Sequence, residues 1–213
     1  RRPESGGGEV TGGAMSAGRT HRRRPTPDAL SERIVKTALA MAEESGWANL
    51  RLRRVAARLG VSLSEVHRRF RDQDAIADAW FARAFAAMLA AAERTGFARR
   101  PARERLDILL RAWFDALAPH RRVTAAMIAV KLYPPHPHHW MPAIFNVSRL
   151  IQWLRDAAGF DAGGVRRSVE EIALTGLFLA LLAVWARDES PGQERTRRSL
   201  ARALDAWSNT IAP

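Results

Sequence analysis

Apolar residues recur at three- and four-residue spacing along most of the chain beyond residue 27, which is the period of a helix packed on one face. The first such stretch should begin at Thr26-Pro27, with Thr as the N-cap and Pro at the first helical position, and should end at Gly46. No stretch alternates with period two for long enough to form a strand. The pattern therefore predicts an all-α protein of about nine helices.

The segment from Arg51 to Phe70 predicts two short helices joined by a tight turn. Gly60 can adopt the left-handed conformation that ends the first helix, and Ser62 can cap the second. Val66 and Phe70, four residues apart, would anchor the second helix on the core. Its outward residues are then Leu63, Ser64, Glu65, His67 and Arg68. A helix pair of this form with an exposed polar helix describes a helix-turn-helix, which places its second helix in the major groove of DNA.

The remainder of the chain predicts a long helix from Asp72 to about Arg94 and a series of further helices. These are expected near 102–118, 120–132, 138–158, 166–188 and 191–211, separated by Pro and Gly. We therefore divide the chain into a tail with a basic arm (1–26), a helix-turn-helix domain (27–72) and a larger helical domain (73–213).

The charge distribution agrees with DNA binding. The chain carries a formal net charge of +12, and residues 1–70 hold 14 Arg/Lys against 7 Asp/Glu. Arg22, Arg23 and Arg24 form a basic arm before the first helix, which could enter a minor groove or remain a solvated tail. Because 32 of the 34 basic residues are Arg, a general compositional bias is the alternative explanation.

Other features narrow the class of protein. There is no cysteine, which excludes disulfides and favours a cytoplasmic setting. The longest uncharged apolar run, Ile172 to Ala186, is 15 residues, shorter than the roughly 18–20 of a membrane span. The N-terminus has no apolar segment of a secretory signal, and Met15 is a candidate for the first native residue.

We find no phosphate-binding loop or nucleophile elbow, so neither an enzyme nor a cofactor is expected. His136, His138 and His139 fit a loop better than a metal site.

The run from Val55 to Ser62, followed by Val66 and Phe70, resembles the signature of the TetR/AcrR family of transcriptional regulators over about residues 27–80. Departures fall at polar positions: Ser64 replaces a small residue that is usually Gly, His67 a Tyr and Gln73 a Lys. Arg51 stands where a capping Thr is usual, so that Asn49, or no side chain, would cap the second helix. Glu65 could accept a hydrogen bond from a cytosine amino group. The expected DNA contacts are Arg22, Arg23, Arg24, Arg51, Arg53, Ser62, Leu63, Ser64, Glu65, His67, Arg68 and Gln73.

The resemblance also implies a homodimer that binds a palindromic operator on double-stranded DNA and is released by a hydrophobic small molecule, most simply as a repressor. Aromatic and aliphatic residues of the larger domain are candidates for the ligand pocket: Trp113, Phe114, Met127, Trp140, Phe145, Trp153 and Phe178. Ordinary core packing is the alternative for each of them. Candidates for the dimer interface are Leu177, Leu181, Trp185, Leu200, Leu204 and Trp207.

A second resemblance leaves another function open. The stretches from Trp113 to Arg121 and from Ala183 to Ser190 are similar to lipid-binding accessory proteins of ubiquinone biosynthesis, which share the TetR fold without binding DNA. A membrane would be a partner only in that case. The last helix distinguishes the two, because an exposed amphipathic helix suits membrane delivery whereas bundle packing with a second copy suits a regulator.

Overall fold

The structure is a computed structural model that describes residues 28–131 and 137–210, with side chains at 28–131 and 146–208. The described residues form α-helices and short 3-10 turns, with no strand among them, so the prediction of an all-α fold is confirmed. The α-helices are α1 (Ala29–Ser45), α2 (Leu52–Leu59), α3 (Leu63–His67), α4 (Gln73–Ala92), α5 (Ala102–Leu117), α6 (Arg121–Lys131), α7 (Pro137–Ala158), α8 (Gly164–Ala186) and α9 (Glu194–Thr210). The 3-10 turns are η1 (Trp47–Asn49), η2 (Phe97–Arg99), η3 (Ala118–His120) and η4 (Pro191–Gln193).

The first helix starts later than its sequence suggested. Its N-cap is Asp28, whose Oδ1 accepts a hydrogen bond from Leu30 N at 3.4 Å, and not Thr26, which lies outside the described residues. Both residue types are good caps, but Asp28 is also held by Arg69 of the segment after α3, whose Nε lies 2.5 Å from Asp28 Oδ2. The predicted end at Gly46 is confirmed, with φ of 84°.

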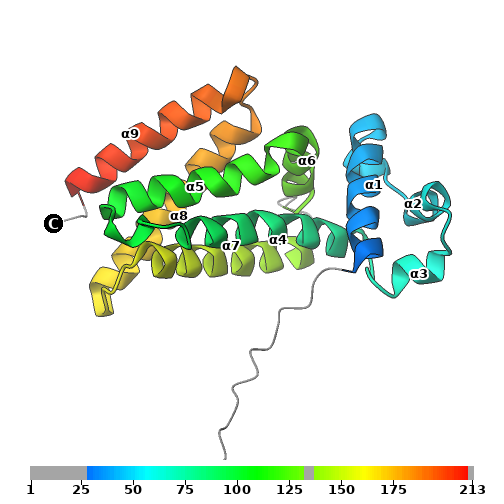
Figure 1. Cartoon of the computed structure of the whole chain (residues 1–213), viewed down its shortest axis with the longest axis horizontal. Coiled ribbons are helices and arrows are strands. Elements are labelled where there is room, and N and C mark those ends of the chain that lie inside the picture. The colour runs from blue at the N-terminus through cyan, green and yellow to red at the C-terminus, as the bar shows by residue number, and fades with distance from the viewer. Residues whose placement is uncertain (1–27, 132–136, 211–213) are drawn as a thin grey trace, which may run out of the picture.

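Helix α1 lies between the α2–α3 pair and the rest of the molecule (Figure 1). Helix α4 leads away from this end and runs beside α5, with α7 along its other side. Helix α9 lies along α5 and α8 at the edge of the body. The arrangement places α3 at one extremity of the molecule, where a large partner can reach it.

Buried contacts connect these helices. Trp80 of α4 is only 5% exposed, and its Nε1 donates a hydrogen bond of 2.8 Å to Thr124 Oγ1 of α6. The Thr124 hydroxyl in turn donates to His120 O at 2.8 Å, so both polar groups are satisfied inside the core. The position of α4 is therefore tied to that of α6.

Asp188 organises the turn between α8 and α9. Its carboxylate is fully buried and accepts hydrogen bonds from the backbone and hydroxyl of Ser190 at 3.0 and 2.5 Å and from those of Thr196 at 2.7 and 2.6 Å. Burial by itself raises the pKa of this carboxyl, but the hydrogen bonds outweigh burial and hold the pKa well below its usual range. The four donors thus fix the direction in which α9 leaves α8.

Helices α4 and α8 are each long and apolar enough, by length and composition, to span a membrane. The sequence analysis counted only residues in an unbroken run without charge, which is a stricter criterion than the mean hydropathy of a whole helix. The run from Ile172 to Ala186 is therefore shorter than α8 itself. In the structure α4 packs against α5, α1 and α7, and α8 against α9, α7 and α6. Apolar core helices of a multi-helix domain pass the same test.

Candidate nucleic-acid interface

The turn before α3 has the predicted geometry. Gly60 closes α2 in the left-handed region, with φ of 67° and ψ of 30°. Ser62 Oγ then accepts a hydrogen bond from Glu65 N at 3.2 Å, and Glu65 Oε2 accepts one from Ser62 N at 2.9 Å. This reciprocal capping box satisfies backbone groups at the start of α3 with side chains of the same turn.

Helix α3 has one buried side and one exposed side. Val66 is fully buried and Phe70 is 7% exposed, so both anchor the helix on the core as predicted. Ser64, His67 and Arg68 are exposed, and Leu63 is 52% exposed. With about 100° between successive residues, these four side chains fall within an arc of about 140°. The structure therefore gathers most of the predicted base-contacting residues on one surface, which we call the α3 face (Leu63, Ser64, His67 and Arg68).

Glu65 belongs to the capping box of α3. It is half-buried, and its carboxylate turns back to Ser62, where it also accepts from Ser62 Oγ at 3.0 Å. Hydrogen bonds from the Ser62 backbone and hydroxyl lower the pKa of the Glu65 carboxyl. Glu65 therefore stabilises α3 through Oε2, and its predicted contact with a cytosine amino group stays a prediction.

Some of the side chains outside α3 that were predicted to contact phosphate already make hydrogen bonds within the protein. Arg51 is exposed, yet its Nη1 donates to the carbonyl oxygens of Ala48 and Leu50 at 3.0 and 2.9 Å. Arg53 is exposed on α2. The Gln73 amide donates to Trp47 O at 2.6 Å and is half-buried, so its predicted place on a phosphate is not supported. Arg22, Arg23 and Arg24 lie outside the described residues.

Two features of α2, its cap and an ion pair with α1, were left open or not predicted from the sequence. No side chain caps α2, since the Asn49 amide donates to Ser45 O at 2.8 Å instead. Arg58 of α2 pairs with Glu44 of α1 through two hydrogen bonds of 2.8 Å each. This pair raises the pKa of Arg58 and lowers that of Glu44.

The predicted pocket residues whose side chains the structure describes are packed in the core or lie on the surface. The side chains of Trp113, Phe114, Met127 and Phe178 are at most 5% exposed, and the first two pack on the Phe178 ring with centroids 5.1 and 6.0 Å away. Ordinary core packing is thus their role here. Trp153 is 44% exposed and sits edge-on to Phe85, on the surface. The side chains of Trp140 and Phe145 lie outside the described set, as do those of His138 and His139, which stand in the first turn of α7 and not in a loop, and the whole of His136.

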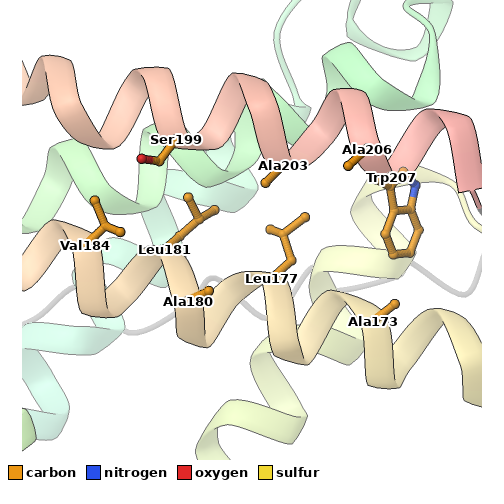
Figure 2. Close-up of a pocket in the computed structure, with 9 residues that line it drawn as sticks. All are labelled: Ala173, Leu177, Ala180, Leu181, Val184, Ser199, Ala203, Ala206 and Trp207. Carbon is orange, nitrogen blue, oxygen red and sulfur yellow. The ribbon is translucent and has the colours of Figure 1, made fainter.

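An apolar groove of about 400 Å³ lies instead between α8 and α9 (Figure 2). It is lined by Ala173, Leu177, Ala180, Leu181, Val184, Ser199, Ala203, Ala206 and Trp207. Most of the predicted interface residues are largely covered by their own protomer, because Leu181, Trp185, Leu200, Leu204 and Trp207 are at most 6% exposed. They join α9 to α5 and α8 within the protomer, but Leu177, Leu181 and Trp207 also line the groove, so their place in a dimer interface stays a prediction.

Several exposed apolar residues of α8 are not among the individual interface candidates named from the sequence. Val165, Val169, Ile172 and Leu179 are 82%, 49%, 73% and 46% exposed. Together with Gly176 and Ala183, which are also exposed, they form a stripe spaced four, three, four, three and four residues apart, the α8 stripe. This spacing could have been found in the sequence, but periodicity alone did not tell which of the apolar faces of α8 remains uncovered.

Similar solved structures are TetR-family regulators. The TetR transcriptional regulator from Nitrosomonas europaea ATCC 19718 is 43% identical, with a TM-score of 0.76 over 84% of this chain and 99% of that chain. A TetR transcriptional regulator from Rhodococcus sp. RHA1 shares the fold at 19% identity, with a TM-score of 0.58 over 84% of this chain and 96% of that one. No family model matches the sequence, and no curated protein does. From the 43% identity across nearly the whole of the Nitrosomonas protein, together with the helix-turn-helix geometry, we conclude that this chain belongs to the TetR family of transcriptional regulators.

Proposed function

We propose that this protein is a cytoplasmic repressor that binds a palindromic DNA operator as a homodimer and is released by a hydrophobic small molecule. The observation that carries the proposal is the α3 face, because its four side chains are exposed on a helix whose other side is held in the core. Residues at the start of the second helix of a helix-turn-helix contact base edges in the major groove.

Phosphate contacts would surround this face. Arg68 follows α3 as its C-cap residue, and Arg53 is exposed on the neighbouring α2. Arg51 can reach a phosphate if its guanidinium keeps one of its two carbonyl contacts and turns the remaining N–H groups outward, since guanidinium has five donors. The arm at residues 22–24 would add charge beside the groove.

A second copy of the chain is the partner that best explains the α8 stripe. Its four-and-three spacing is that of helices packed side by side in bundles. A Cβ added to Gly176, in the middle of the stripe, would meet nothing within 4 Å, so a partner helix has room to approach there. The groove between α8 and α9 lies beside the stripe and would receive apolar side chains from the second copy. A two-fold axis through this surface presents two α3 faces, which is why the operator should be palindromic.

Release by a ligand would act through linkage. A hydrophobic molecule that enters the helical body must separate packed rings such as Trp113, Phe114 and Phe178, and it therefore favours a different packing of α5 and α8. The buried Trp80–Thr124 hydrogen bond joins α6 to α4, which connects directly to α3. A ligand that prefers the altered packing lowers DNA affinity by the ratio of its affinities for the two states.

The position of α9 favours a regulator over a lipid-delivering protein. Its apolar residues Leu200, Leu204 and Trp207 are buried against the body, at most 6% exposed, and so are not presented to a membrane surface. An interfacial helix would have to leave this site and expose them.

The test is selection of bound sequences from a pool of random duplexes, followed by titration of the recovered duplex at several salt concentrations. We expect a palindrome, and affinity losses in His67→Ala and Arg68→Ala. Arg122→Ala, at an exposed arginine of α6 away from α3, is the matched control and should bind normally. Weak, sequence-independent binding that disappears at moderate salt would refute the proposal, since it would reflect the basic composition alone.

A further inference from the structure

Leu63 is the one large apolar side chain on the α3 face, and it is 52% exposed. It is the first residue of α3, directly after the N-cap Ser62. Val66, the other apolar residue of this helix, is fully buried. Local structure therefore does not require an apolar side chain at position 63, because α3 already has its cap and its anchor.

The residues around Leu63 leave it uncovered. The Ser62 and Glu65 side chains are bonded to each other in the capping box and are not spread over it. On the helix surface Leu63 lies beside His67, about 40° away. An apolar group next to a polar one at the start of a recognition helix would face the edges of one or two neighbouring base pairs.

The chemistry of the major groove then restricts what Leu63 can contact. Guanine, adenine and cytosine edges present hydrogen-bond donors and acceptors, and covering these with a leucine leaves polar groups without water or a partner. Thymine alone presents a methyl group, at C5. An apolar contact there removes two apolar surfaces from water without that penalty.

We infer that Leu63 selects thymine at one position of each operator half-site by packing on its C5 methyl group. This inference rests on the proposed DNA binding. In a homodimer the contact is made twice, and the two positions are related by the two-fold symmetry of the operator.

The test uses the duplex recovered by selection, with each symmetric pair of thymines replaced in turn by deoxyuridine, which removes only the methyl groups. Burial of one methyl corresponds to about a three- to fivefold change in affinity, so a symmetric pair corresponds to roughly tenfold or more. We expect one such pair to weaken wild-type binding by this amount. Leu63→Ala should weaken binding to the thymine duplex similarly and be indifferent to the replacement at that pair, while Arg122→Ala, at the exposed arginine of α6, should keep the full methyl effect.

The inference would be overturned if no deoxyuridine pair weakens the wild-type protein, or if the effect is undiminished in Leu63→Ala. Because Leu63 is exposed, its variant should unfold at the wild-type temperature, and a melting curve checks this. Failure to recover any specific duplex is a different result: it would count against the proposed function itself, and it would be seen before this experiment begins.

Discussion

Replacing Ile172 by Lys should separate the proposed dimer without unfolding the protomer. Ile172 is 73% exposed at the centre of the α8 stripe, so the folded chain makes little use of its side chain. Surface substitutions of this kind usually change the free energy of unfolding by less than about 0.5 kcal/mol. Lys also keeps a good helix propensity, which protects α8 itself.

The effect of the Ile172→Lys substitution on dimer formation can be calculated from the same exposed fraction of the Ile172 side chain. Complete burial of an Ile side chain is worth about 1.5–3 kcal/mol, and most of that remains to be gained by Ile172. A partner should therefore gain roughly 1–2 kcal/mol from each copy, or about 2–4 kcal/mol per dimer. This corresponds to a dissociation constant raised by about 30- to 1000-fold, before any cost of burying the Lys charge.

Sedimentation velocity over a range of concentrations measures this constant, with a protomer of 23.7 kDa. Val130→Lys is the control, because Val130 is another exposed β-branched residue, 38% exposed, on α6 and outside the stripe. It should leave the dimer intact. A wild-type protein that stays monomeric at tens of micromolar, or an Ile172→Lys variant that associates as tightly as wild type, would refute the reasoning.

Three further results are expected. Glu65→Ala should cost about 0.5–2 kcal/mol in urea unfolding through loss of the capping box but select the same operator sequence; a changed base preference at one position would contradict a purely structural role of Glu65. Asp188→Ala should cost about 2–4 kcal/mol. The pKa of the Asp188 carboxyl is lowered in the folded state, so its contribution to the free energy of unfolding should be complete above the ordinary carboxyl pKa of about 4 and shrink as the pH falls below that value. A stability difference between wild type and variant that grows in acid would exclude the mechanism. A hydrophobic molecule that weakens operator binding should itself bind more weakly, by the same factor, to the protein–DNA complex in calorimetry; equal affinities for free and DNA-bound protein would rule out linkage.

Features set by neighbouring residues could be predicted from the sequence. Gly60, Ser62 and the Val66–Phe70 anchor act within a few residues of each other, and the structure has each where the spacing predicted. The start of α1 was mistaken because the choice between Thr26 and Asp28 depends on Arg69, which is 41 residues away from Asp28.

Features set by packing partners could not be predicted in this way. Periodicity marked Leu200, Leu204 and Trp207 as apolar, but it did not say whether the same chain or a second copy covers them. The structure covers them with α5 and α8 and leaves the α8 stripe exposed instead. Likewise, residue size suggested Trp113 and Phe178 for a pocket, whereas whether large rings leave a cavity or fill it depends on how the rings meet.

The capping box of α3 has a consequence for how related regulators could diverge. Substitutions at Leu63, Ser64, His67 and Arg68 touch neither the cap nor the core, so a duplicated copy of this gene could explore new operators there at almost no loss of stability. Changes at Ser62, Glu65 or Val66 would first weaken the helix that carries the others. We therefore expect natural variation among such copies to be concentrated at the four exposed positions. Substitutions at the other positions of α3 lower the stability of the fold and should be retained less often.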